Sequence, residues 1–125
     1  MSESLKRLPD SELAVMQAVW RCPIPATRSQ IEKELPVSMA ATTVLTLLSR
    51  LAEKGYLTVE KEGKSNVYTP TVTQDSYVAQ ESTHFFRKLC GGSISTFASA
   101  LCNSSLSRQE IEEIRRLLEE GGTKL

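Results

Sequence analysis

The sequence lacks long hydrophobic runs. No apolar run among the 125 residues approaches the ~20 that a transmembrane helix needs, although 40% of the residues are hydrophobic. The first residues, MSESLKRLPD, contain no apolar stretch of the kind that secretory signals carry. We therefore expect a chain that is not inserted in a membrane and that stays in the cytoplasm.

An excess of charge of one sign is also missing. The 15 Lys and Arg residues equal the 15 Asp and Glu residues, so the formal net charge is zero. This balance argues against a protein that binds nucleic acid or membranes through overall positive charge. Binding to phosphates would have to come from local groups of basic side chains.

Cysteine and histidine are few, and their spacing does not match known metal-binding or catalytic motifs. Cys22, Cys90 and Cys102 show no CxxC or CxC spacing, and His84 is the single histidine. This argues against a disulfide framework, a zinc ribbon and a multi-histidine metal site. His84 and Cys90 fall on different helix faces, and no Walker loop, GxGxxG, HExxH or GxSxG motif is present. We expect no metal, no cofactor and no enzymatic activity, and we expect the cysteines to be buried apolar residues.

Apolar periodicity and capping signals predict two helices near the N-terminus. Leu13, Met16 and neighbouring valines recur at helical spacing after Pro9-Asp10. Two prolines between residues 21 and 25 then end this helix. Thr27 and Gln30 have the spacing of a capping box, which predicts a second, short helix that stops at the proline of position 36.

The pattern that follows is typical of a winged helix. After a turn of two or three residues, a longer helix is expected over 38–54, with Gly55 in the left-handed position that ends it. Such a pair of helices is a helix-turn-helix candidate. β-branched and aromatic residues at 56–61 and 67–70 then flank a polar turn at 62–66, which predicts a hairpin that would form the wing.

Three amphipathic helices are expected in the remainder. Thr73 would cap the first, with Val72 and Tyr77 as a hydrophobic staple, and Gly91-Gly92 would end it. Ser93 would begin the second, and a capping box of Ser107 and Glu110 would begin the third, which would continue to Gly121-Gly122. Short helices cannot bury such stripes alone, so a second copy of the chain is the simplest partner.

These elements predict a mainly α fold with a small β-hairpin. An N-terminal winged helix-turn-helix domain would cover residues 1–72, and a helical dimerisation domain would cover residues 73–125. The residues expected in the dimer interface are Phe85, Phe86, Phe97, Leu101, Ile111, Ile114 and Leu118.

Several segments carry a family pattern in order along the chain: LPDSELAVMQAVW, TTVLTLLSRLAEKGYL, EKEG, VYTPTV, SYVAQES, FFRKLCGG and LSRQEIEEIRRLLEE. Together they resemble the penicillinase-repressor family of bacterial transcription regulators (BlaI, MecI and CopY) over residues 8 to 120. The resemblance implies a homodimeric winged-helix repressor that binds a dyad-symmetric DNA operator and controls an antibiotic-resistance or stress-response gene.

The candidate DNA contacts lie on the second helix of the helix-turn-helix and on the wing. Threonines near the helix start can offer base edges a hydroxyl and a methyl group, and basic residues further along can reach phosphates. The candidates are Thr42, Thr43, Thr46, Arg50, Lys54, Lys61 and Lys64. Family members often place polar residues where this chain has Ala40, Ala41 and Leu45, so base readout here would depend more on apolar contact and DNA shape.

Other interpretations of the same residues stay open. The threonines can form a solvated helix face, the wing lysines can serve solubility, and the module can bind proteins without sequence-specific DNA binding. The resemblance also implies release by a membrane sensor protease that cuts an Asn-Phe bond, but this chain has Ser99-Ala100 there. Induction would follow a cut within residues 94–106, or a ligand or thiol oxidation at Cys90 or Cys102. The C-terminal EEGGTKL lacks the CxC pairs of copper-responsive members, so copper control is unsupported.

Overall fold

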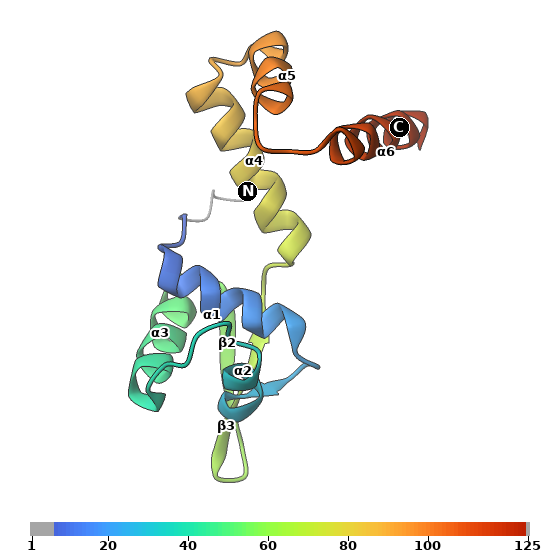
Figure 1. Ribbon diagram of the computed structural model, residues 1–125. Helices are drawn as coiled ribbons and strands as arrows, with labels where there is room; N and C mark the ends of the chain where they lie inside the picture. Colours follow the sequence, from blue (N-terminus) through green and yellow to red (C-terminus); the bar gives the residue numbers. More distant parts are fainter. Residues whose placement is uncertain (1–6, 125) are drawn as a thin grey trace. The chain divides into compact units, whose positions relative to one another are not determined.

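The computed structural model describes residues 7–124, which form helices and one small antiparallel sheet (Figure 1). The chain divides into two compact units, of which the first ends at Glu81 and the second begins at Ser82. The predicted boundary after residue 72 lies before helix α4, whereas the units divide within that helix. The mainly helical fold class is confirmed.

Three helices of the first unit occur in the predicted order. They are α1 (Asp10–Arg21), α2 (Arg28–Lys33) and α3 (Ala41–Glu53). The capping box of α2 is confirmed, because Gln30 N–H donates to Thr27 Oγ1 at 3.2 Å and Thr27 N–H donates to Gln30 Oε1 at 2.9 Å. Gly55 has a φ of 85°, as expected for the residue that follows a helix end.

The start of α3 differs from the prediction. The helix begins at Ala41 rather than Ser38, and its N-cap residue Ala40 is extended and makes no side-chain cap. The connection from α2 is therefore longer than the expected two or three residues. Leu35 and Met39 lie in it, and both pack against the hydrophobic core. This packing outweighs the local helix propensity of Met39-Ala40.

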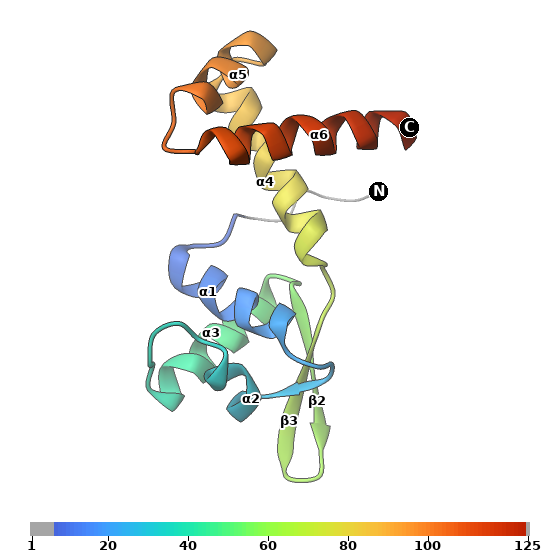
Figure 2. The ribbon, with the colours of Figure 1, turned by 45° about the vertical axis from the view of Figure 1, so that its right-hand side comes forward.

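The sheet has one strand more than the predicted hairpin. Strands β2 (Leu57–Glu62) and β3 (Ser65–Pro70) form the wing, and β1 (Ala26–Thr27) pairs with the other side of β3, so the order is β1-β3-β2. Glu62 pairs with Ser65, which leaves a two-residue turn instead of the predicted turn over 62–66. Gly63 opens this turn with a φ of 66°, which suits the twist of a tight hairpin. In Figure 2 the turn extends beyond the helices of this unit.

One hydrophobic core joins the helices and the sheet of the first unit. Val15 and Met16 of α1 and Leu48 of α3 have no exposed surface, and Tyr56, just before β2, is equally buried. Burial raises the pKa of Tyr56 to about 12, with smaller contributions from nearby Tyr77 and Glu81. The core holds α3 by its apolar face, so the opposite face of that helix is left to solvent.

The second part of the chain contains α4 (Gln74–Leu89), α5 (Ile94–Cys102) and α6 (Arg108–Lys124). The predicted caps are confirmed, since Thr73, Ser93 and Ser107 each accept a backbone N–H with the side-chain oxygen at 3.1 Å. Gly91 and Gly92 have positive φ after the end of α4, as expected. The predicted end of α6 at Gly121-Gly122 is wrong, because Gly121 does not take a positive φ and the helix continues to Lys124.

Apolar side chains of the second unit remain largely at its surface. α5 has no buried residue, although the ring of Phe97 packs on those of Phe85 and Phe86 at centroid distances of 6.3 and 5.7 Å. Cys22 and Cys90 are buried as expected, whereas Cys102 is exposed, so the prediction for Cys102 is wrong. The stripe to which Cys102 belongs is only partly covered by its own chain, since Phe97 and Leu101 are half-buried.

Candidate nucleic-acid interface

Helix α3 has one buried and one exposed face. Val44, Leu47, Leu48 and Leu51 point into the core, and the candidate DNA contacts Thr42, Thr43, Thr46 and Arg50 are all exposed. In the chain this helix follows the connection from α2 and precedes the wing strands, and in the first unit it lies beside α1 (Figure 1). We call the exposed set of Thr42, Thr43, Thr46 and Arg50 the α3 polar face.

The hydroxyl groups on this face are not equivalent. Thr46 Oγ1 donates to the carbonyl oxygen of Thr42 at 2.9 Å, one helical turn earlier. Its hydroxyl hydrogen is therefore used within the helix, and its oxygen lone pairs and methyl group remain for other partners. A threonine in this state can accept a hydrogen bond from a base amino group or contact a thymine methyl.

A small groove adjoins the same helix. It has a volume of about 250 Å³ and lies between the start of α2, Leu45 of α3 and the wing. Its lining residues are Thr27, Arg28, Ser29, Leu45, Lys64, Ser65, Asn66 and Tyr68. The pairing of Thr27 with Val67 brings the start of α2 beside the wing. Sequence reasoning missed Arg28, Ser29 and Asn66, since only the unpredicted strand β1 places them here.

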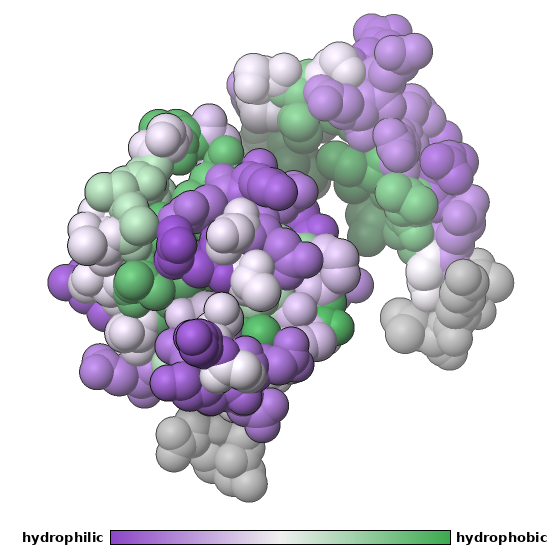
Figure 3. Space-filling view, turned by 90° about the horizontal axis from the view of Figure 1, so that it is seen from below, coloured by the Kyte–Doolittle hydropathy of each residue, from purple (hydrophilic) through white to green (hydrophobic). Residues whose placement is uncertain are grey.

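Lysines of the wing are exposed, and they alternate with acidic residues. Lys61 lies between Glu60 and Glu62 on β2, and alternation along the strand places Lys61 on the opposite side of the sheet from both. Lys64 occupies the two-residue turn and lines the groove. Figure 3 looks at the molecule from below, and the face of the first unit seen there is largely hydrophilic. The wing can therefore present cations on one side without a net positive charge.

Lys54 differs from the other candidates because its ammonium group is bound within the protein. It donates to Glu12 Oε1 of α1 at 2.5 Å, and the Glu12 side chain is only 5% exposed. The charge of Lys54 is therefore compensated inside the unit. Its position supports a structural role, in which it joins the end of α3 to α1.

Comparison with known proteins places the chain in a family. The sequence model of the penicillinase repressor family matches residues 8–120, which include residues of both units. The chain belongs to the penicillinase repressor family. This family is one of transcriptional repressors, which are not enzymes, and the resemblance seen in the sequence is confirmed.

Within the penicillinase repressor family, two relatives cover nearly the whole chain. The penicillinase repressor of Bacillus licheniformis is 33% identical over an alignment of 121 residues, and the match covers 93% of this chain and 94% of the relative. The methicillin resistance regulatory protein MecI of Staphylococcus aureus (strain N315) is 27% identical over an alignment of 120 residues, and the match covers 94% of this chain and 98% of the relative.

A solved structure supports the fold of the first unit. The DNA-binding domain of the repressor BlaI has 32% sequence identity and a TM-score of 0.51, and the match covers 61% of this chain and 94% of that one. The winged-helix class predicted from the sequence is confirmed. The α3 polar face and the wing thus belong to a unit that is similar to a DNA-binding domain.

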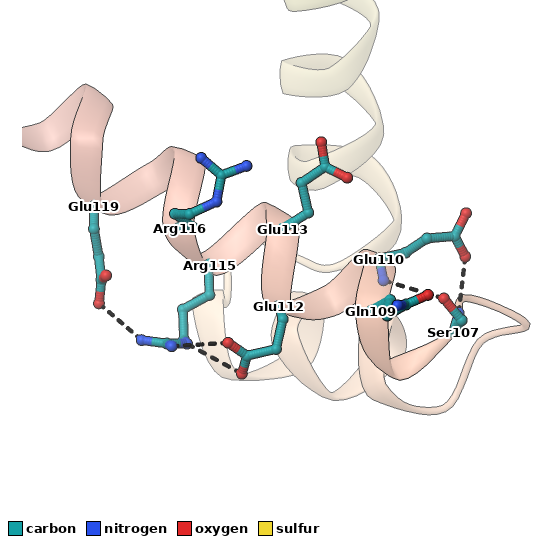
Figure 4. Close-up of a pocket in the computed structure, with 8 residues that line it drawn as sticks. All are labelled: Ser107, Gln109, Glu110, Glu112, Glu113, Arg115, Arg116 and Glu119. Atoms are coloured by element: carbon teal, nitrogen blue, oxygen red, sulfur yellow. Dashed lines mark hydrogen bonds and ion pairs between the residues drawn. The ribbon is translucent and has the colours of Figure 1, made fainter.

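Helix α6 of this penicillinase repressor family member is polar on one side (Figure 4). Arg115 forms ion pairs with Glu112 at 2.8 Å and with Glu119 at 3.1 Å, and Arg116 pairs with Glu120 at 3.2 Å. The hydrogen bond from Arg115 holds the pKa of the Glu112 carboxyl below its usual value. These pairs hold the polar face of α6 together, while apolar residues lie elsewhere on the helix.

Two further features of residues 7–124 bear on the chemistry that the chain can perform. His, Cys, Asp and Glu side chains nowhere gather there in a group of three that could hold a metal ion. No helix within the same residues is long and apolar enough to cross a membrane.

Proposed function

We propose that the chain is a transcriptional repressor that binds duplex DNA with α3 in the major groove. The α3 polar face carries this proposal, because it presents hydroxyl and guanidinium groups on a helix whose other face is fixed in the core. The likeness of the first unit to the DNA-binding domain of BlaI supports it. A repressor of this kind acts in the cytoplasm, where promoter DNA is accessible.

Base recognition would come from the first two turns of α3. Thr43 and Thr46 would meet base edges, with Thr42 beside them. Leu45, which is 41% exposed, would add apolar contact with a thymine methyl. Because few groups on this face can donate hydrogen bonds to bases, part of the specificity would come from the shape and deformability of the operator.

Phosphate contacts would come from Arg50 and from the wing lysines Lys61 and Lys64. Such contacts fix the position of the protein on the duplex and carry no sequence information. The net charge of the chain is zero, so a small number of contacts must supply the electrostatic part of the affinity. The logarithm of the affinity should fall linearly with the logarithm of the salt concentration, with a slope of about −0.9 for each phosphate neutralised.

The repressor would bind its operator as a homodimer joined through the second unit. Ile94, Leu117 and Leu118 are 71%, 51% and 69% exposed in one protomer, which is unusual for large aliphatic residues on amphipathic helices. A second copy would cover them and form a two-fold interface that matches a dyad-symmetric operator. The proposed interface residues are Phe85, Phe86, Phe97, Leu101, Ile111, Ile114 and Leu118.

Release from the operator would follow a cut within residues 94–106 by a membrane sensor protease. Ser99 and Ala100 are exposed on α5. A protease needs an extended segment, so the end of α5 would have to open before it is cut. The cut would separate α6 from the DNA-binding unit, and the dimer would lose one of its helices. A regulated antibiotic-resistance or stress-response gene would then be transcribed.

The DNA-binding proposal is tested by selection of bound sequences from a pool of random duplexes, followed by footprinting on the chain's own promoter. The double variant Thr43→Ala/Thr46→Ala should lose operator preference, whereas Arg50→Ala should weaken specific and non-specific binding together and reduce the salt slope by about one. Ser76→Ala and Arg87→Ala, which change exposed residues of α4, serve as matched controls. Unchanged specificity in the double variant would remove the threonines from the interface. If the wild type selects no sequence, the winged helix is a protein-interaction module.

Proteolytic release is tested in cells. The protein is immunoblotted before and after exposure to a cell-wall antibiotic, while transcription from the target promoter is measured. We expect a shorter fragment that ends within residues 94–106 to accumulate as transcription rises. An intact band at full transcription would instead show that a ligand or another modification ends repression.

A further inference from the structure

The beginning of α4 is part of the first unit rather than a linker. Tyr77 is the one buried residue of this helix, with 5% of its surface exposed, and it belongs to the hydrophobic core that α1, α3 and the strands form. Its ring centroid lies 5.9 Å from that of Trp20 on α1 and 5.8 Å from that of Tyr56. The first turns of α4 are therefore anchored in the core of the first unit through Tyr77.

Polar contacts fasten the same segment at several points. The N–H of Leu8, a residue with 4% exposure, donates to the Tyr77 hydroxyl oxygen at 3.1 Å. Trp20 Nε1–H donates to the carbonyl oxygen of Val72, just before α4, at 2.8 Å. Arg7 forms an ion pair with Glu81 at 3.2 Å. A buried N–H without a partner is costly, so the Tyr77 hydroxyl is also needed to satisfy Leu8.

These contacts determine how the chain leaves the first unit. The unit ends at Glu81, well inside α4, and α4 continues to Leu89 without a glycine or proline. A helix is much stiffer than a loop of the same length, and its direction follows from the turns that are fixed. The packing of Tyr77, and not the short connection before Thr73, therefore fixes the direction of the first turns of α4 relative to the core of the first unit.

We propose that Tyr77 is a positioning residue for operator binding, which clamps the start of α4 and thereby sets the half-site spacing at which a dimer binds both halves of an operator. The proposal rests on the proposed function, since it requires a dimeric DNA-binding protein. If each DNA-binding unit of a dimer is held in a fixed direction relative to α4, the dimer can bind two half-sites at once only where the half-site spacing fits that direction. A loosely joined pair would tolerate many spacings.

The test compares the spacing preference of full-length variants. The probes are duplexes that carry two copies of the selected half-site, at the natural spacing or with one, two or five base pairs inserted, and a duplex with a single half-site. We expect the wild type to prefer the natural spacing by at least about tenfold. Tyr77→Ala should remove most of this preference, while its affinity for the single half-site stays within about twofold of wild type.

Two further variants keep the test decisive. Tyr77→Phe retains the ring and loses the hydroxyl, so we expect it to fold even if Tyr77→Ala does not. Amide hydrogen exchange at Leu8 should be faster in this variant, because the Leu8 N–H loses its acceptor. Val78→Ala truncates the next residue of α4, which is 51% exposed, and should keep the wild-type preference. Analytical ultracentrifugation should show that all variants remain dimers.

The outcomes separate this inference from the proposed function. If Tyr77→Ala keeps the wild-type spacing preference, Tyr77 is not a positioning residue, although operator binding stands. If the variants lose single half-site affinity to the same extent as full-operator affinity, Tyr77 only stabilises the first unit and the proposal is wrong. If the wild type prefers no sequence at all, the proposed function fails and this inference fails with it.

Discussion

Val15, Met16 and Val19 of α1 have no exposed surface within one protomer, whereas α5, with an equally regular apolar stripe, has no buried residue. The first helix belongs to the first unit and the second helix to the second. In Figure 3 green apolar patches lie beside purple polar ones on the second unit. Periodicity thus identifies the apolar face of a helix in both units, but what covers that face depends on the rest of the fold.

The same contrast holds for charged groups. The Glu12–Lys54 ion pair of the first unit joins two helices and has one side chain 5% exposed, whereas the partners of the Arg115–Glu112 pair on α6 are both 60% exposed. Exposed pairs within one helix contribute little to stability, while a buried pair fixes the arrangement of its helices. The first unit is therefore specified from within, whereas the apolar faces of the second would be covered by the proposed second copy of the chain.

The largest effect should come from a core substitution in the first unit. Leu48→Ala removes a side chain with no exposed surface and leaves a cavity. We expect the free energy of unfolding of this unit to fall by about 2–5 kcal/mol. Urea denaturation followed by Trp20 fluorescence measures it, and the loss should not depend on protein concentration. Leu118→Ala is the control, since it changes an exposed residue of α6 and should leave this transition in place.

A charge on the apolar side of α6 should break the dimer without unfolding the protomer. Leu118 is 69% exposed, so Leu118→Asp should not disturb packing within a single protomer. We expect it to sediment as a monomer at micromolar concentration and to lose operator affinity about 100-fold, because two half-sites are no longer bound together. Gln109→Asp places the same charge on the polar side and should remain dimeric. A dimeric Leu118→Asp variant would place the interface elsewhere.

Removal of the buried ion pair should have a smaller effect. Glu12→Gln takes away the charge that compensates Lys54, although Lys54 is 26% exposed and can be hydrated. We expect the first unit to lose about 1–3 kcal/mol in its free energy of unfolding. Arg115→Ala in α6 removes two exposed pairs and should leave the unfolding of the first unit unchanged. Equal effects of the two variants would contradict the distinction between the units.

The smallest effect concerns the titration of tyrosine. Tyr56, Tyr68 and Tyr77 are the 3 tyrosines of the chain, and all lie in the first unit. The pKa of Tyr56 is raised from an ordinary 10.0 to about 12, because burial disfavours the phenolate. Its contribution to stability is complete below pH 10 and is lost as the pH rises toward 12. Tyrosinate absorbance should include a late step from Tyr56, which Tyr56→Phe removes and which no substitution in α6 alters.

Local signals predicted the helix ends well. The capping box of Thr27 and Gln30 and the glycines at 55, 91 and 92 act within a few residues, so their geometry follows from the sequence alone. The signal at Gly121 failed because glycine permits a helix to end but does not require it. Exposure of the α3 polar face was also predictable, since it is the complement of the apolar stripe.

Contacts between distant residues were not predictable in this way. The partner of Lys54 is 42 residues away in the sequence, and the partner of the Leu8 amide is 69 residues away. Strand β1 has only two residues, too few for an alternating pattern, and it exists because β3 lies beside it. The groove next to Leu45 depends on that pairing, so Arg28, Ser29 and Asn66 could not be recognised from the sequence.

The position of β2 in the sheet has a consequence for how copies of the chain can associate. With the order β1-β3-β2, this strand is an edge strand within residues 7–124, and an open edge can recruit strands of other molecules into growing aggregates. All of its residues after Leu57 are exposed, and Glu60, Lys61 and Glu62 place three charges along that edge. Charged edges resist strand addition, so polymerisation through the sheet is suppressed. Association would thereby be left to the helices, where the proposed two-fold pairing would close on itself and stop at two copies.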